Sequence, residues 1–245
     1  MYVIIPNTIK GIIHLRFPSQ SEMTHSMFRL SEYFESPFNT IREHYFSVKQ
    51  FYSSYVNVYE EYFNYFEGFN IPLESILSFA DKFNTLEFNS ERNCKDNKSM
   101  IREHLMRLHS IESIVDWRWN LESEVDLIIT ENKIVNDVIK ADAKYLIVDF
   151  IGADEDVLQH EICHAMYKLD NDYKLKIDSI LISLGYDTLI KLSMCLLSKS
   201  YTSDNVFDEI HAYLITSTDD ELIETFDTFE LDEIKVIVNK FKGVL

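Results

Sequence analysis

The spacing of apolar positions changes along the chain and predicts where strands give way to helices. Residues 2–17 contain two short apolar, β-branched runs around a Pro-Asn and Lys-Gly turn region, which predicts two strands. From Ser21 to Glu67, apolar positions recur at steps of three, four and seven, which predicts helix. A break over residues 67–72 precedes a further predicted helix from Leu73 to Phe83.

Aromatic residues are concentrated in the first helical part. A stripe of aromatic side chains at helical spacing is more typical of a core than of a ligand platform. We therefore expect a core role for Tyr45, Phe46, Phe51, Tyr52, Tyr55, Tyr59, Tyr62, Phe63, Tyr65 and Phe66.

The rest of the chain is mostly helical in pattern, with two apolar runs that favour strands. The polar segment Asn89–Ser99 predicts an exposed loop or linker. Strands are predicted around Val125–Ile129 and Tyr145–Ile151. Helices are predicted at Ser99–Ile114, Tyr173–Leu184, Thr188–Ser198, Asn205–Thr216, Glu221–Phe229 and Asp232–Lys242. The pattern indicates a helix-rich α+β fold with a small sheet.

A further helix is predicted directly after the run Tyr145–Ile151, which ends at Gly152. Asp154 can serve as its N-cap, and acidic residues in the first turn complement the helix dipole. On a helical wheel the residues divide into two sides. The apolar side holds Leu158, Ile162, Ala165, Met166 and Leu169, and the opposite side holds His160, Glu161, His164 and Lys168. We expect a core face against the sheet, a separate chemical face, and a helical bundle after this helix.

The chemical face carries the spacing H-E-x-x-H. Residues four apart lie above one another on a helix, so His160 and His164 can bind one metal ion. Glu161 can then act as general base on a metal-bound water. The alternative is an accidental pattern on a solvated helix. Composition predicts this pattern by chance in only about 0.02 of such chains, so the metal site is favoured.

A catalytic zinc takes a third protein ligand, and the sequence offers several candidates. The longer pattern with a third nearby His is absent, because Tyr167 and Asn171 occupy its Gly and His positions. In the predicted helix 205–216, the wheel defines an inward face of Val206, Phe207, Ile210, Tyr213, Leu214 and Ser217. Glu209 lies at the edge of that face, whereas Asp208 and His211 are predicted to point away. Glu209 is the preferred ligand and His211 the reserve; an ordinary surface carboxylate is the alternative for Glu209.

The two motifs together resemble the gluzincin type of zinc metallopeptidase. The similarity rests on H-E-I-C-H-A and the later Asp-Glu-Ile-His-Ala-Tyr, and it covers about thirty residues. It implies a Zn²⁺ ion held by His160, His164 and Glu209, with Glu161 as general base. Length and pattern predict one compact unit, 1–245, whose residues 1–90 form an aromatic helical subregion. Residues 91–245, which contain both motifs, are expected to form a zincin-like catalytic subregion.

The chain departs from the gluzincin pattern at one position. Many gluzincins carry an Asp one turn after the ligand Glu to orient a ligand His, and here that position is Tyr213. Asp149, Asp154 or Asp170 could orient the His instead. Tyr213 becomes a candidate donor to the developing oxyanion, with Tyr167 and then His211 as alternatives; the competing interpretation for each is packing.

These residues predict a zinc-dependent metallopeptidase acting on a peptide or protein substrate. Two alternatives remain open. One is a catalytically inactive zincin-like binding or regulatory protein. The other is a zinc hydrolase of a non-peptide amide, as in deformylase-like enzymes, although Cys94 lacks the Gly-containing motif that supplies the Cys ligand in that type.

Charge and cysteine content limit the classes of binding partner and the cellular compartment that we expect for this protein. The net charge of −18 argues against nucleic acid and anionic membranes, because phosphate binding needs clustered Lys and Arg. Between Lys199 and Lys235 only acidic charges occur, which indicates a solvated acidic surface or a field favouring basic substrates. Three separated cysteines, and neither a signal peptide nor an eighteen-residue apolar run, predict a cytoplasmic protein without a membrane partner. A specialised secretion route is the alternative. The sequence does not determine the oligomeric state.

Overall fold

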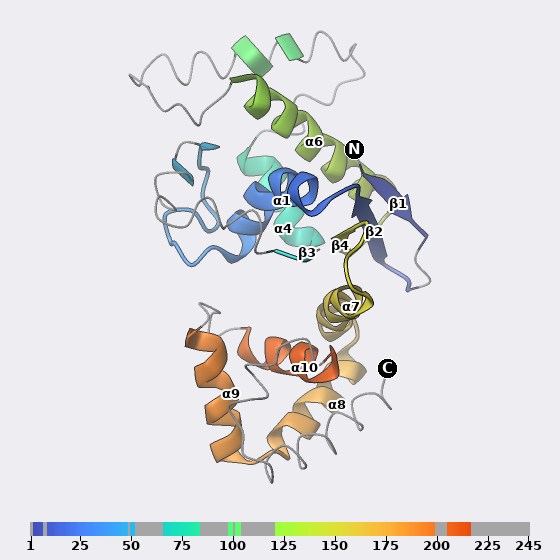
Figure 1. The fold of residues 1–245 in the computed structure, drawn as a ribbon, viewed down its shortest axis with the longest axis vertical. Helices are drawn as coiled ribbons and strands as arrows, with labels where there is room; N and C mark the ends of the chain where they lie inside the picture. The colour runs from blue at the N-terminus through green and yellow to red at the C-terminus, as the bar shows by residue number, and fades with distance from the viewer. Residues whose placement is uncertain are drawn as a thin grey trace.

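The computed structural model shows a helix-rich α+β fold, which confirms the predicted class. Within the part of the chain that the structure describes, the helices form an upper group beside the sheet and a lower group, and helix α7 runs between them (Figure 1). The structure describes residues 2–6, 9–48, 50–51, 66–83, 98–99, 101–103, 121–198 and 205–216. The boundary predicted at residues 90 and 91 lies outside them, so that division stays a prediction.

The sheet has four strands in the order β1-β2-β4-β3. Strands β1 (Val3–Ile5) and β2 (Ile12–Phe17) correspond to the two predicted strands and pair antiparallel. Strand β4 (Tyr145–Phe150) pairs parallel with β2, and β3 (Phe69–Pro72) pairs antiparallel with β4. Strand β3 is therefore an edge of the described sheet, and Pro72 is tolerated there because an edge position needs no inward N–H donor.

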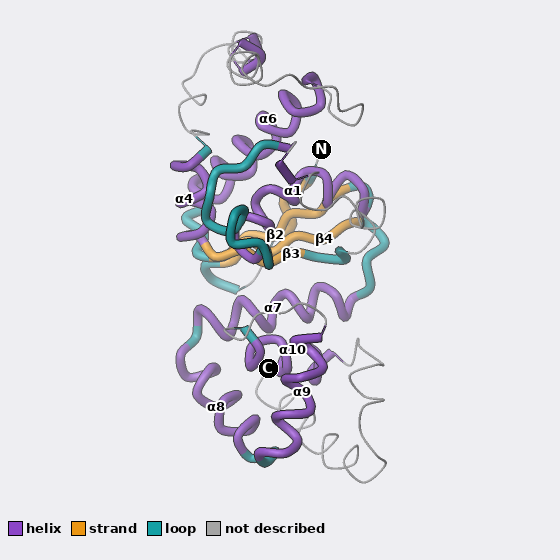
Figure 2. Tube along the Cα trace, turned by 90° about the vertical axis from the view of Figure 1, so that its left-hand side faces the viewer, coloured by secondary structure: helices purple, strands orange, loops and turns teal. Residues whose placement is uncertain are grey.

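Three helices cover one face of the sheet: α1 (Gln20–Glu35), α4 (Leu73–Lys82) and α6 (Leu121–Lys140) (Figures 1 and 2). Alternate strand residues point toward them because side chains alternate across a strand. The inward set from the strands is Ile13, Leu15, Phe17, Phe69, Ile71, Leu146 and Val148. A fully buried Arg29 on α1 donates from Nε to Glu131 Oε1 on α6 at 2.8 Å, which ties these two helices together.

Helix α7 (Glu155–Leu169) packs against the opposite face of the sheet and also against the lower helices (Figures 1 and 2). Leu158, Ile162 and Ala165 contact the sheet side. Cys163 and Tyr167 belong instead to a second core with α8 (Asn171–Ile182), α9 (Tyr186–Ser198) and α10 (Val206–Thr216). The expectation of one core face and one separate chemical face is therefore corrected: α7 is buried on two sides, and its chemical residues lie between them.

The start of α7 follows the predicted pattern. Gly152 adopts a φ of +99°, a backbone conformation open mainly to glycine, at the turn between β4 and α7. The Asp154 side chain accepts a hydrogen bond from the backbone N–H of Asp156 and caps the helix. Because these signals are local, the sequence predicts this strand-turn-helix unit correctly.

The predicted strand Val125–Ile129 is wrong, since these residues lie within α6. Their β-branched side chains favour strand, but the preference amounts to only tenths of a kcal/mol per residue. Val125, Ile128 and Val135 fall on one buried stripe at helical spacing. Burial of that stripe outweighs the local propensity.

The predicted helix Ser21–Glu67 is also too long. Helix α1 ends at Glu35, because Ser36 precedes Pro37 and is held in an extended conformation. The predicted break over 67–72 contains strand β3. In the aromatic stripe, Phe46 and Phe51 are core residues, Phe66 is partly buried, and Tyr45 is exposed. The other stripe members lie outside the described residues.

Only some of the remaining helix predictions fall on residues that the structure describes. Helices α4, α8, α9 and α10 agree with prediction to within two residues at each end. Residues 98–99 and 101–103 are helical, while the rest of 99–114, the segment 89–97 and both C-terminal predicted helices lie outside the described residues. Among the described helices none is by itself long and apolar enough to cross a membrane; α8 and α9 reach that length only as a pair bent by 110°.

Candidate metal centre

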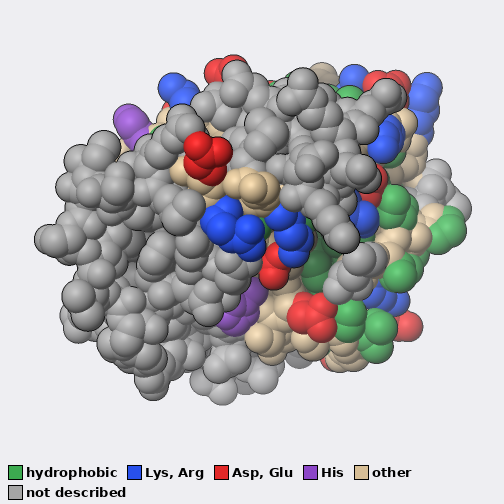
Figure 3. All heavy atoms as spheres, turned by 90° about the horizontal axis from the view of Figure 1, so that it is seen from above, with side chains coloured by type: hydrophobic (Ala, Val, Ile, Leu, Met, Phe, Trp, Pro, Cys, Tyr) green, Lys and Arg blue, Asp and Glu red, His purple; other side chains and the backbone are tan. Residues whose placement is uncertain are grey.

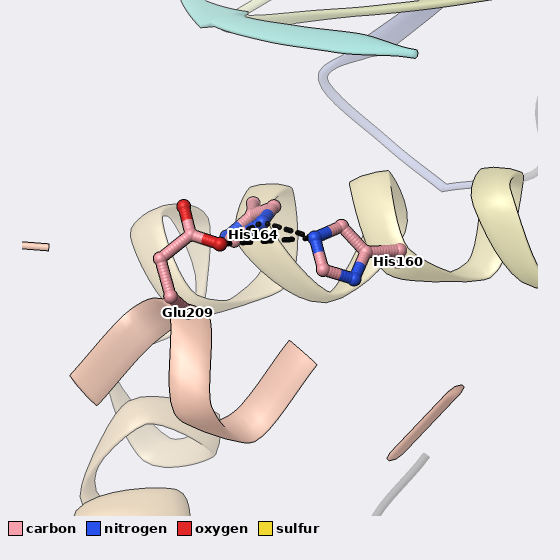
Figure 4. A group of neighbouring side chains, drawn as sticks. All are labelled: His160, His164 and Glu209. Carbon is pink, nitrogen blue, oxygen red and sulfur yellow. Dashed lines mark hydrogen bonds and ion pairs between the residues drawn. The ribbon is translucent and has the colours of Figure 1, made fainter. Parts of the chain in front are cut away.

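Two helices bring the three predicted ligands together. His160 and His164 project from successive turns of α7, and Glu209 reaches them from the first turn of α10 (Figure 4). The two Nε2 atoms are 3.1 Å apart. Oε2 of Glu209 lies 3.8 Å from Nε2 of His160 and 3.6 Å from Nε2 of His164. The predicted trio is therefore a compact triangle of one oxygen and two nitrogens.

The triangle fits a tetrahedral cation. Zinc bonds of about 2.0–2.1 Å at tetrahedral angles separate ligand atoms by about 3.3–3.5 Å, close to the three observed distances. Oε2 of Glu209 is buried and has no hydrogen-bond partner among the described residues. A buried acceptor without a donor is costly, and a cation would satisfy it. The donor set of two imidazoles and one carboxylate is that of a catalytic zinc site with an open position.

Asp208 contacts one of the two predicted His ligands. Its Oδ1 lies 2.9 Å from Nδ1 of His164, which directs Nε2 of that ring toward the triangle. Burial disfavours the charged imidazolium, but Glu209 and Asp208 outweigh it and raise the pKa of His164 to about 10. The same pairing overcomes the effect of burial on Asp208 and lowers its pKa. A cation at the triangle would displace the proton on His164.

The three residues predicted to orient a His ligand contact other groups instead. Asp149 accepts a hydrogen bond from Arg16 Nε at 2.8 Å and lies beside His14. Asp154 and Asp170 cap the N-termini of α7 and α8. The orienting residue is Asp208, which the wheel had placed away from the site.

The predicted orientation of α10 is wrong in part. Phe207 is 37% exposed, whereas Asp208 and His211 are buried. Helix α10 contacts α7 on one side and α8 and α9 on others, so it has no polar outer face where the wheel expects one. A helical wheel assigns only apolar residues to the buried face. It therefore predicts the wrong position for an aspartate that is buried because it pairs with a histidine.

The reserve ligand His211 stands apart from the triangle. The ligand atoms of His160, His164 and Glu209 lie within 4.8 Å of one another, and His211 is not in this group. Its ring stacks on Tyr167 with centroids 5.0 Å apart, and burial lowers its pKa to about 4. The hydroxyl of Tyr167 donates to Asp178. Tyr167 belongs to the second core and His211 packs on it, which favours packing roles for both residues.

Glu161 is held by residues of strands β3 and β4. Asn70 Nδ2 donates to its Oε2 at 2.7 Å, and the hydroxyl of Tyr145 donates to Asn70 Oδ1 at 2.8 Å. Burial raises the pKa of Glu161, while His164 and the Asn70 hydrogen bond oppose that effect in part. A Cβ at Gly68 would lie 2.6 Å from Oε1 of Glu161, so only glycine leaves room for this carboxylate. Nothing in the local sequence identifies Asn70, Tyr145 or Gly68, because their contacts join segments far apart in the chain.

The site opens into a cavity of about 300 Å³. Its lining comes from α1, residues 66–70, α7 and α10, and it includes all three predicted ligands and Glu161. Tyr213 also lines it, with its ring centroid 4.7 Å from that of His160. The structure thus brings the predicted Tyr213 to the cavity and leaves Tyr167 outside its lining.

Comparison with known proteins adds no further assignment. No protein-family model, curated protein or solved structure matches the chain.

Proposed function

We propose that this protein is a zinc-dependent metallopeptidase of the gluzincin type. The observation that carries the proposal is the convergence of His160 Nε2, His164 Nε2 and Glu209 Oε2 on one point beside Glu161, at the wall of a cavity. With a cation bound, these would be two neutral ligands and one anionic ligand, next to a carboxylate that is not part of the triangle. A bound Zn²⁺ would lower the pKa of a coordinated water and polarise a carbonyl group.

Glu161 is the proposed general base. Its Oε2 is occupied by Asn70, which leaves Oε1 on the side of Gly68 to accept a proton from the attacking water. Burial raises the pKa of this carboxyl, which favours return of the proton to a leaving amine. Tyr213, beside His160 at the cavity wall, is the proposed hydrogen-bond donor to the developing oxyanion.

A peptide substrate is favoured by strand β3. This strand pairs only with β4 within the described sheet, and its residues Phe69 and Asn70 line the cavity. An edge strand offers backbone N–H and C=O groups to an extended peptide. A peptide lying along β3 would bring its backbone next to Glu161. The cysteine pattern supports a cytoplasmic location as part of the proposal.

Zinc content and hydrolysis, measured on the same variants, test the proposal. We expect about one zinc per chain in the wild type, as for a catalytic site of this type. Zinc should be lost with His164→Ala and Glu209→Ala and kept with His211→Asn. The exposed His25 supplies the control variant His25→Ala. Glu161→Gln should keep zinc but lose hydrolysis of casein and internally quenched peptides.

Three outcomes separate this proposal from its alternatives. No zinc after reconstitution would refute the metal site. Zinc without hydrolysis of any peptide would favour a metal-binding protein that lacks turnover. Activity only on short non-peptide amides such as N-formyl amino acids would favour the amidohydrolase alternative.

A further inference from the structure

A buried tyrosine hydroxyl hydrogen-bonds to the residue that holds Glu161. The hydroxyl of Tyr145 donates to Asn70 Oδ1 at 2.8 Å, and Asn70 Nδ2 donates to Glu161 Oε2 at 2.7 Å. Tyr145 is 1% exposed and Glu161 is 6% exposed. Polar groups more often lie at the surface, where Figure 3 shows charged side chains of both signs on the described part of the upper face. Burial of a polar group costs free energy unless its hydrogen bonds are made, so the partners in this network constrain one another.

The pairing of β3 with β4 brings Tyr145 to Asn70. In the antiparallel register, Asn70 lies opposite Ile147 and Pro72 lies opposite Tyr145. Side chains two positions apart along a strand point to the same face, so Asn70 and Tyr145 are diagonal neighbours on the face that packs on α7. Diagonal neighbours in a sheet are within reach of an aromatic side chain. The sheet therefore sets the position of the hydroxyl relative to the amide.

The amide of Asn70 has two orientations, and one of them suits Glu161. An Asn side chain presents an acceptor oxygen on one side and a donor nitrogen on the other. In the observed orientation Nδ2 faces Glu161 and Oδ1 faces Tyr145. Rotation by half a turn would bring Oδ1 against Glu161 Oε2, and a carboxylate oxygen only accepts hydrogen bonds. It would also leave the Tyr145 hydroxyl without an acceptor, because no other described residue hydrogen-bonds to that group.

We propose that Tyr145 is a positioning residue for Glu161 that acts through Asn70, because its hydroxyl selects the amide orientation in which Nδ2 faces the carboxylate. The inference rests on the proposed function, in which Glu161 is the general base, and deepens it by naming how the sheet holds that base. Burial, followed by repulsion from Asp208, raises the pKa of Tyr145 well above its ordinary value, so the hydroxyl keeps its proton for this bond. With Oε2 held, Oε1 stays on the side of Gly68.

Tyr145→Phe tests the proposal because it removes the hydroxyl and keeps the ring in the core. The zinc-loaded variant should keep the zinc content and KM of the wild type and lose about tenfold in kcat, roughly the effect of one hydrogen bond. Tyr33→Phe is the matched control: Tyr33 is 2% exposed, and its hydroxyl lies 2.6 Å from Ser78 Oγ, away from the cavity lining. This control should keep the kcat of the wild type. Wild-type kcat in Tyr145→Phe, or an equal loss in Tyr33→Phe, would overturn the proposal.

A double-mutant cycle distinguishes a role through Asn70 from a general loss of stability. In the Asn70→Ala background no amide remains to be oriented, so Tyr145→Phe should cause no further loss of kcat. Effects of the two substitutions that multiply would show that they act independently. That result would refute the proposed route from Tyr145 to Glu161.

The side-chain amide of Asn70 can also be observed without turnover. Its two Nδ2 protons give a pair of resonances in a ¹H–¹⁵N spectrum, identified by their absence from Asn70→Ala. We expect these protons to exchange with water at the wild-type rate in Tyr33→Phe and at least severalfold faster in Tyr145→Phe. An unchanged rate in Tyr145→Phe would refute the positioning role, whatever the activity of the variant.

The two measurements separate failure of this inference from failure of the proposed function. If the wild type hydrolyses no peptide but the exchange of the Asn70 amide depends on Tyr145, the positioning of Glu161 stands and only the metallopeptidase proposal fails. If the wild type hydrolyses peptides and neither kcat nor amide exchange depends on Tyr145, the metallopeptidase proposal stands and the positioning role is refuted.

Discussion

Nδ1 of His164 lies 2.9 Å from Oδ1 of Asp208, so the residue directly before the predicted ligand Glu209 orients a second predicted ligand. Adjacent residues of α10 thus serve both ends of one imidazole: Asp208 at Nδ1 and Glu209 at Nε2. Because both come from one helical turn, any shift of α10 against α7 would disturb both contacts together. The geometry of the candidate metal centre therefore depends on the packing of these two helices.

Asp208→Asn should weaken zinc binding by roughly 10–100-fold, the usual effect of removing a carboxylate that orients a ligating His. The Asn amide cannot offer the negative charge that holds His164 in place. Competition against a chromogenic chelator measures the affinity. Asp172→Asn, at an exposed position in the first turn of α8, is the control. An unchanged zinc affinity in Asp208→Asn would show that Asp208 does not orient the ligand.

Gly68→Ala should lower kcat/KM by about 100-fold, because misplacement of a catalytic group by about 1 Å can cost that much. The added Cβ would meet Oε1 of Glu161 at 2.6 Å and Val157 at 3.1 Å. Zinc content should remain that of the wild type, since neither residue is in the ligand triangle. Asn70→Ala should reproduce the loss by releasing Oε2 of the same carboxylate. Wild-type turnover in both variants would argue against a positioned Glu161.

Arg29→Met should destabilise the fold by about 3–5 kcal/mol, because it leaves the fully buried Glu131 without its partner. Urea denaturation followed by circular dichroism measures the free energy of unfolding. Lys98→Met removes the exposed pair with Asp126 and should cost less than about 1 kcal/mol. The double variant Arg29→Met, Glu131→Leu should recover much of the loss. A single variant as stable as the wild type would contradict a structural role for the buried pair.

Asp149 gives a pH dependence of stability with a defined sign. Burial alone would raise its pKa, but hydrogen bonds from Arg16 and His14 outweigh it and lower the pKa below the ordinary value of 3.8. The pairing therefore stabilises the fold fully above that ordinary value, and the contribution is lost as the pH falls through the lower folded-state pKa. Asp149→Asn should be less stable than the wild type at pH 6, and the difference should shrink below pH of about 4. Unfolding free energies of both proteins across this range provide the check; a constant difference would disprove the linkage.

The sequence by itself determined those features that depend on neighbours in the chain. The spacing of His160 and His164 is a property of any helix, and Gly152 and Asp154 mark its start through local backbone preferences. Glu209 was selected from the candidates on one predicted helix because the wheel puts it at the edge of the inward face, and the structure places it beside His160 and His164. The same local reasoning failed at Val125–Ile129, where strand propensity and helical burial disagree and burial prevails.

Only the tertiary structure decided which residues surround the chemistry. Asp208 is buried because His164 lies opposite it, and Asn70 reaches Glu161 because β3 pairs with β4 beside α7. Gly68 and Glu35 line one cavity because the same packing brings the end of α1 and the start of β3 together there. A helical wheel or a motif contains no information about contacts between distant segments. The hydrogen bonds and charge pairs across those contacts are therefore determined by the tertiary structure alone.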